Sequence, residues 1–152
     1  MPPCGIVQQE VCMDLAGILV AWAHAHAGFV AGGNEAGMLL GGDVRGADAA
    51  VWRRDAAAPA THTLRRTPPV LAVEVAGRDE GEPELREKAG WYLDAGVEVV
   101  WLVLPDSREV VVVTRAGETR CGAPGRVPPH PSLPDLEPEV RALFLQLDQS
   151  QP

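Results

Sequence analysis

A single acidic residue interrupts an otherwise apolar stretch in the middle of the chain. Residues 70–76 read Val-Leu-Ala-Val-Glu-Val-Ala, with two prolines before them and Gly77 after them, so the only charged side chain is Glu74. This pattern is typical of a strand buried on both faces, as in the middle of a parallel sheet. A carboxylate there is costly unless a metal ion, a cation or a proton compensates its charge. Glu74 is therefore a candidate functional residue.

The segment that follows places a lysine on the inner face of a predicted helix. Residues 82–95 have helical composition and end at Gly96, a residue type favoured just after a helix. Leu85, Lys88, Ala89 and Tyr92 recur at helical spacing and form one stripe. The stripe should pack against the sheet, which would bring Lys88 towards the strand that carries Glu74.

A second carboxylate, Asp48, lies near the start of another predicted strand, residues 47–52. Two carboxylates on adjacent strands can share one divalent cation of the Mg²⁺ type, which lowers the pKa of a bound water and clamps a phosphate oxygen. A neighbouring lysine can orient or deprotonate that water, or neutralise charge in the transition state. Asp48, Glu74 and Lys88 together fit phosphodiester hydrolysis. Singly, each residue also has a structural interpretation. Asp48 would accept turn hydrogen bonds, Glu74 would belong to a buried ion pair, and the stem of Lys88 would cover apolar surface.

The remaining pattern predicts one mixed α/β domain over residues 1–152, with irregular ends at 1–11 and 148–152. The predicted elements are a helix at 12–27, two short strands with glycine-rich turns within 29–43, the 47–52 strand, a connection at 55–68 that includes a helical turn, the Glu74 strand, the 82–95 helix, a buried strand at 97–104, a turn at 105–108, a strand at 110–114, a turn-rich stretch at 116–135 and a closing helix at 135–147. A strand, a helix and a second buried strand make a βαβ unit.

Composition limits the function classes. The 152 residues carry a net charge of −8, which argues against tight non-specific binding of nucleic acid by a monomer, although a local basic rim or a dimer groove remains open. Three scattered cysteines favour reduced thiols. No signal peptide and no membrane span is predicted, so the expected location is the cytoplasm. His24 and His26 are interpreted as structural, and the four tryptophans as core or interface residues.

Several stretches resemble one known family. The matching segments are Gly33-Asn-Glu-Ala-Gly-Met-Leu-Leu40, Val44-Arg-Gly-Ala-Asp-Ala-Ala-Val51, Pro69-Val-Leu-Ala-Val-Glu-Val75, Leu85-Arg-Glu-Lys-Ala-Gly-Trp-Tyr-Leu-Asp-Ala-Gly-Val97, Val100-Trp-Leu-Val-Leu-Pro-Asp106 and Leu133-Pro-Asp-Leu136. In order and spacing they resemble the Uma2 family, a domain of unknown function within the PD-(D/E)XK nuclease superfamily. The resemblance covers residues 3–147.

The resemblance implies a restriction-endonuclease-like fold, a mixed β-sheet flanked by helices, and a site for Mg²⁺ or Mn²⁺. By position, Asp48 and Glu74 would bind the metal, Lys88 would complete the catalytic set from the helix, and Glu35 would be an accessory acid. The chain departs from the family pattern at Ala47, where a proline is usual, and at Gly77, where a serine is usual. Ala76 stands at the superfamily's usual lysine position, as expected if Lys88 has taken over that role.

The sequence therefore supports three hypotheses. The first is a Mg²⁺- or Mn²⁺-dependent nuclease, a homodimer that acts on DNA. The second is a catalytically inactive member of the same fold that serves as a dimeric binding module. The third, motivated by the scarcity of basic residues, is an enzyme that acts on a small phosphate-containing substrate.

Overall fold

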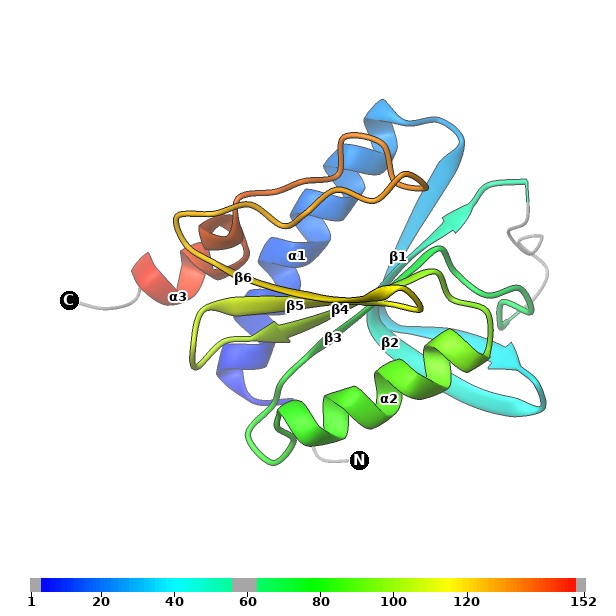
Figure 1. Ribbon diagram of the computed structural model, residues 1–152, viewed down its shortest axis with the longest axis horizontal. Coiled ribbons are helices and arrows are strands. Elements are labelled where there is room, and N and C mark those ends of the chain that lie inside the picture. The colour runs from blue at the N-terminus through cyan, green and yellow to red at the C-terminus, as the bar shows by residue number, and fades with distance from the viewer. Residues whose placement is uncertain (1–3, 56–62, 150–152) are drawn as a thin grey trace.

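The computed structural model describes residues 4–55 and 63–149, which form a six-stranded mixed sheet with helices on both faces (Figure 1). The elements are α1 (Ile6–Ala25), β1 (Phe29–Leu40), β2 (Asp43–Arg53), β3 (Leu71–Val75), α2 (Glu82–Asp94), β4 (Val99–Leu104), β5 (Glu109–Thr114), β6 (Gly117–Gly122), the 3₁₀ helix η1 (Val140–Phe144) and α3 (Leu145–Gln149). The predicted class, a mixed sheet flanked by helices, is confirmed.

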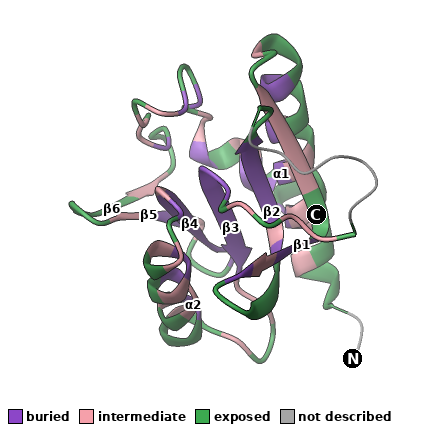
Figure 2. Ribbon diagram, turned by 90° about the vertical axis from the view of Figure 1, so that its right-hand side faces the viewer, coloured by how far each residue is buried: buried purple, intermediate pink, exposed green. Residues whose placement is uncertain are grey.

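The strands lie in chain order, β1-β2-β3-β4-β5-β6, and only β3 and β4 are parallel. Both are buried along their whole length (Figure 2), as their continuous apolar sequences predict. The helix between them is α2, so the predicted βαβ unit is confirmed. It sets Glu74 opposite Leu102 at the centre of the sheet.

Two apolar layers sandwich this sheet. One combines residues of α1, η1 and α3 with one sheet face, including the fully buried Leu15, Val73 and Phe144. The other combines α2 with the opposite face, including Leu85 and Ala89. The alternation along β3 sends Val73 and Val75 into the first layer, and Ala72 into the second. Glu74 therefore faces α2.

The first helix starts earlier than predicted. Residues 6–11, expected to be irregular, are its first turns, and Val11 is fully buried. The helix is also long and apolar enough to cross a membrane, contrary to expectation. That match is weak evidence, because core helices pass the same test and Val11, Leu15 and Leu19 of α1 pack into the core.

The glycine-rich stretch forms one long strand, where two short strands were predicted. β1 continues through Gly32 and Gly33 and pairs with β2, with a register shift between Gly33 and Ala36. Asn34 and Glu35, both at positive φ, supply the extra residue of this β-bulge. Gly41 and Gly42, with φ of 59° and 90°, make the hairpin turn to β2.

The C-terminal third also differs from prediction. The stretch 116–135 contains β6, an edge strand of mostly exposed polar residues that lacks an apolar pattern. The predicted helix at 135–147 begins only at Val140, because the preceding backbone is extended: Val127 N–H donates to Pro138 and Val140 N–H to Gly125. In the closing segment, α3 extends to Gln149, beyond the expected boundary at 147. Part of the predicted 55–68 connection, with its helical turn, lies outside the described residues.

Candidate active site

Glu74 is the only buried charged residue among those that the structure describes, with 3% of its surface exposed. Both carboxylate oxygens are engaged by α2. The Tyr92 hydroxyl donates to Oε1 at 2.6 Å, and Lys88 Nζ donates to Oε2 at 3.1 Å. The carboxylate is thus compensated by a cation and a hydroxyl, as a buried acid requires.

Local sequence explains why α2 presents this pair. Glu84 accepts a hydrogen bond from the Gly81 backbone N–H at the start of the helix, where its negative charge also interacts favourably with the helix dipole. At the other end, Gly96 has φ of 102° and lets the chain turn out of the helix. Lys88 and Tyr92 are four residues apart and therefore share one face. The predicted stripe is confirmed, and Tyr92, predicted only as a member of it, also contacts the carboxylate.

Asp48 is half-buried in β2 and contacts the strand that carries Glu74. Its Oδ2 accepts a hydrogen bond from Val75 N at 2.7 Å. The Val75 carbonyl accepts one from Gln8 Nε2 of α1 at 3.3 Å. Pairing between β2 and β3 stops at Ala49 and Val73. The N–H and the carbonyl of Val75 therefore form their hydrogen bonds with the side chains of Asp48 and Gln8. Gln8, in a segment predicted to be irregular, is a site residue that sequence reasoning missed.

Charges couple the two carboxylates through Lys88. Burial raises the pKa of Glu74, against the opposing effects of the Tyr92 hydrogen bond and the Lys88 charge. Burial likewise raises the pKa of Asp48, against the bond from Val75 N and the Lys88 charge. For Lys88, burial alone would lower the pKa, but its ion pairs with Glu80 and Glu74 outweigh burial and raise it. Lys88 is therefore a cation at neutral pH.

Glu80 is a third carboxylate at the site that the sequence did not indicate. It lies in the loop between β3 and α2, and its Oε1 is 2.8 Å from Lys88 Nζ. The backbone bond from Gly77 N to the Glu80 carbonyl, 3.1 Å long, holds the turn that presents it. The only signal in the sequence was its place between two candidate residues, because a loop acid has no periodicity.

Glu35 is not brought into this cluster. It is exposed within the β1 bulge, which lies opposite Asp48 in the register, and its backbone and Cβ lie against Gly46. Within residues 4–55 and 63–149, no hydrogen bond or ion pair joins its carboxylate to Asp48, Glu74 or Lys88. The bulge places the backbone of Glu35 near the site while its side chain stays in solvent. Its accessory role remains a prediction.

A cleft of about 940 Å³ adjoins the cluster. It is lined by residues 5–8, 76–82 and 104–107, that is, by the start of α1, the β3–α2 loop and the β4–β5 turn. Gln8 and Glu80 belong both to this lining and to the site, whereas Asp48, Glu74 and Lys88 do not line the cleft. The cleft and the site therefore adjoin at Gln8 and Glu80.

The residues present fit a divalent cation of the Mg²⁺ type. Asp48 and Glu74 are hard oxygen donors on adjacent strands, and Mg²⁺ is commonly bound by one or two carboxylates with water completing its shell. No group of three or more potential ligand side chains gathers anywhere in the described part of the chain. The Lys88 ammonium shows that a cation is already accommodated at Glu74. A metal there would share or displace this ammonium.

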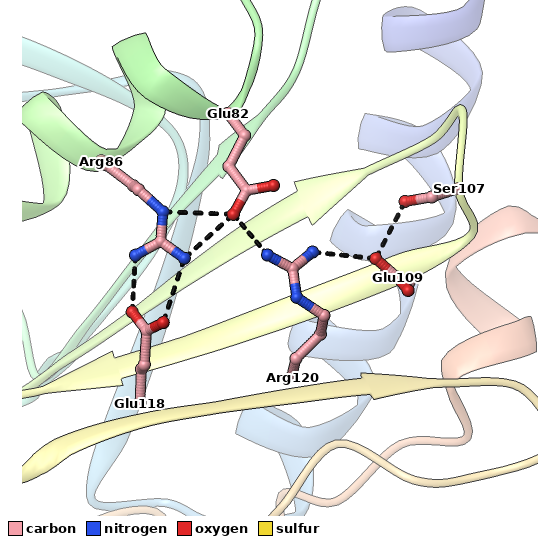
Figure 3. Close-up of polar contacts among 6 residues, drawn as sticks. All are labelled: Glu82, Arg86, Ser107, Glu109, Glu118 and Arg120. Atoms are coloured by element: carbon pink, nitrogen blue, oxygen red, sulfur yellow. Dashed lines mark hydrogen bonds and ion pairs between the residues drawn. The ribbon is translucent and has the colours of Figure 1, made fainter.

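A second, more exposed network of charges, called the outer network below, lies between α2 and strands β5 and β6 (Figure 3). Glu82 accepts hydrogen bonds from Arg86 and Arg120, while Glu118 accepts from Arg86 and Glu109 accepts from Arg120. These side chains are 28–48% exposed. The network joins α2 to β5 and β6, and within the described part of the chain no hydrogen bond or ion pair links it to Glu74 or Lys88.

Comparison with known proteins agrees with this architecture. A family model described as "Uma2: Putative restriction endonuclease" matches residues 1–147. The structure is similar to one titled "Crystal structure of a putative nuclease belonging to DUF820" from Anabaena variabilis, with a TM-score of 0.85 and 16% identity over 96% of this chain and 84% of that chain. At that identity the likeness establishes the fold alone. No curated protein matches the chain. Because the family model spans almost all of the sequence, the chain belongs to the Uma2 family.

Proposed function

We propose that this protein is a Mg²⁺- or Mn²⁺-dependent endonuclease that hydrolyses phosphodiester bonds of nucleic acid, with DNA as the expected substrate. The observation that carries the proposal is the buried Glu74 carboxylate, held by Tyr92 and Lys88 beside a second carboxylate, Asp48. Family membership and the likeness to a structure titled as a "putative nuclease" support it.

In this proposal Asp48 and Glu74 hold the divalent cation. The bound cation would supply a Lewis acid for a phosphate oxygen and lower the pKa of a water. Tyr92 fixes the orientation of the Glu74 carboxylate through its 2.6 Å hydrogen bond. Lys88, whose pKa is raised, stabilises negative charge on the reacting phosphate in preference to removing a proton.

Away from the reacting phosphate, a cation that no carboxylate neutralises is best suited to contact nucleic acid. Arg86 and Arg120 are both saturated by glutamates (Figure 3). Arg45, which is exposed near the β1–β2 turn, differs: its guanidinium lies 4.5 Å from the Trp91 ring, and no ion pair within residues 4–55 and 63–149 engages it. Its charge is close enough to affect the Tyr92 hydroxyl. We infer that Arg45 contacts a substrate phosphate beside the Glu74 site.

The proposal includes a homodimer, since a pair of sites can cut both strands of a duplex in one binding event. Large apolar side chains are exposed on α1: Ile6 is 74% exposed, Met13 67% and Val20 44%. Burial of these residues against a second copy would remove apolar surface from water. Light scattering coupled to size-exclusion chromatography, with Met13→Glu beside the wild type, tests this part: a monomeric wild type would contradict it.

A second candidate function is a catalytically inactive binding module with the same fold. The observation that favours it is that both Glu74 oxygens are already occupied, by Tyr92 and Lys88. In that case Glu74 would be a structural ion pair, and removal of divalent cations would change nothing in the protein's behaviour.

The test is cleavage of a plasmid and of single-stranded DNA in Mg²⁺ and in Mn²⁺. We expect metal-dependent cutting that is lost in Glu74→Ala and in Lys88→Ala. Glu87→Ala, which removes an exposed glutamate next to Lys88 on α2, is the matched control and should cut like the wild type. Cutting that persists in Glu74→Ala would overturn the proposed mechanism, and no cutting by a folded wild type would favour the binding module.

A further inference from the structure

Lys88 lies between two carboxylates of different character. Its Nζ is 3.1 Å from Oε2 of Glu74, whose side chain is 4% exposed, and 2.8 Å from Oε1 of Glu80, whose side chain is 32% exposed. An ammonium has three N–H donors, so it can hold both acids at once. Glu74 is a member of the proposed metal pair, whereas Glu80 lies on the loop that lines the cleft.

This arrangement sets up a competition at Glu74. Oε1 is taken by the Tyr92 hydroxyl, so Oε2 is the oxygen open to exchange, and it now carries the Lys88 ammonium. A divalent cation at Glu74 would meet a positive charge within a few ångströms, where repulsion is strong in a partly buried site. Lys88 must therefore have another anion to occupy when the metal binds.

We propose that Glu80 is a positioning residue that retains Lys88 when a divalent cation takes Glu74, so that Lys88 is an exchangeable cation of the metal site. The proposal rests on the proposed function, since it takes Asp48 and Glu74 as the metal pair. Lys88 occupies Oε2 of Glu74 in the absence of metal and stays paired with Glu80 in its presence. Glu80 thereby lowers the cost of metal binding and keeps the ammonium beside the reacting phosphate.

The proposal predicts a specific pattern of metal affinities. In Glu80→Gln, Glu74 is the remaining carboxylate partner of Lys88, so Lys88 competes more strongly with the metal for Glu74. Mn²⁺ should then bind at least about fivefold more weakly than to the wild type. In Lys88→Met, the competing cation is gone, and Mn²⁺ should bind more tightly than to the wild type. In the double variant, Glu80 has no lysine to hold, so its removal should have little effect on the affinity of Lys88→Met.

The experiment is isothermal titration calorimetry with MnCl₂ on the full chain and these three variants, each first checked for an unchanged circular dichroism spectrum and melting temperature. Asp79→Asn is the matched control, because Asp79 is the exposed neighbour of Glu80 in the same loop and lines the same cleft. This control shows how much the loss of one nearby negative charge changes the Mn²⁺ affinity by itself. Rescue of the affinity by Glu80→Asp would show that the carboxylate is what matters.

Different failures are distinguishable. If Glu80→Gln weakens Mn²⁺ binding equally with and without Lys88, then Glu80 acts directly on the metal and the proposal is overturned. An effect of Glu80→Gln no larger than that of Asp79→Asn overturns it as well. If no variant binds Mn²⁺, both the proposal and the metal-dependent function fall. Mn²⁺ binding with the expected coupling but without DNA cleavage would support Glu80's role and contradict the nuclease.

Discussion

One helix, α2, carries two sets of ion pairs whose surroundings differ. On its inner face, Lys88 holds a glutamate that is almost fully buried. On the side towards β6, Arg86 contacts Glu82 and Glu118, whose side chains are 28% and 48% exposed. The chemistry of the contacts is the same, a cation with a carboxylate. What differs is the solvent exposure of the carboxylates, and an electrostatic interaction is weaker where water surrounds it.

The comparison indicates what each set is for. Exposed pairs are screened by water and salt, so the outer network adds little to stability but neutralises the arginines of β6 and α2. A buried ion pair is costly to desolvate, and replacement of the whole pair by well-packed apolar residues is often neutral or stabilising. Retention of Glu74 at the centre of the sheet is therefore better explained by function than by stability.

The largest difference should appear when one glutamate of each set is neutralised. Glu74→Gln keeps the side-chain shape but removes a proposed metal ligand. We expect cleavage to fall by more than about 100-fold, since even loss of a residue that only supports a metal ligand costs about 10- to 100-fold. Glu82→Gln, in the exposed network, should cut within a few-fold of the wild type. Initial rates of plasmid nicking measure cleavage by both variants. Equal losses of cleavage rate in the two variants would contradict the distinction between the two sets of ion pairs.

The next difference concerns hydroxyl donors. Tyr92→Phe removes the donor to Oε1 of the buried Glu74. We expect a loss of about 1.5–3 kcal/mol in the free energy of unfolding, the usual range for a hydrogen bond to a charged group. Ser107 donates to Glu109 in the exposed network, and Ser107→Ala should change stability by less than about 0.5 kcal/mol. Urea denaturation of both variants checks this, and a larger effect for Ser107 would contradict the account.

A smaller effect separates the arginines. Arg45→Ala should weaken DNA binding and lower the slope of log affinity against log salt concentration by about one, as expected for the loss of one phosphate contact. Arg86→Ala should leave that slope unchanged, because its charge is already neutralised by glutamates. Fluorescence anisotropy with Ca²⁺ in place of Mg²⁺ permits the measurement without cutting. The reverse ranking of the two arginines would contradict the proposed DNA contact.

For stability, Arg86→Ala should cost less than about 1 kcal/mol, with the difference shrinking as salt is added. Thermal denaturation at low and high salt checks this. A cost that is large and independent of salt would mean that the outer network is as important to the fold as the buried pair.

The smallest effect is on pH dependence, measured with a chelator present. The folded-state pKa of Glu74 is raised above its ordinary value of 4.5. The ionisation of Glu74 therefore lowers the stability of the fold as the pH rises from 4.5 past the folded-state pKa. The pKa of Glu82 is lowered, so its contribution to stability is present above the ordinary value and is lost as pH falls through the lowered one. With rising pH, Glu74→Gln should therefore gain stability relative to the wild type, whereas Glu82→Gln should lose it. Differences of the same sign would refute the assigned environments.

The sequence predicted the parts of the site that periodicity reveals. Glu74 stood out because it interrupts an apolar run, and Lys88 because it falls on the inner stripe of a helix. Both elements are short-range patterns, and the structure places them as expected. Asp48 was predicted as a strand residue near Glu74, and its hydrogen bond to Val75 N adds a contact that no local pattern encodes.

The parts that were missed depend on tertiary contacts. Glu80 lies in a loop, and Gln8 belongs to a helical turn whose start no capping signal marks. Residues 135–139 contain Pro138, which disfavours a helical conformation at Glu137, and their backbone is held extended by residues 125–127. β6 has no apolar alternation because it is an exposed edge strand. These features leave no helical or strand periodicity in the sequence.

The most direct test of the central claim is a crystal structure with Mn²⁺ bound, located by its anomalous scattering. We predict one peak in contact with the carboxylates of Asp48 and Glu74, with Lys88 Nζ moved off Glu74 Oε2 and still paired with Glu80. A structure in which Lys88 stays on Glu74 and no peak lies at Asp48, at a Mn²⁺ concentration that supports cleavage, would contradict the account.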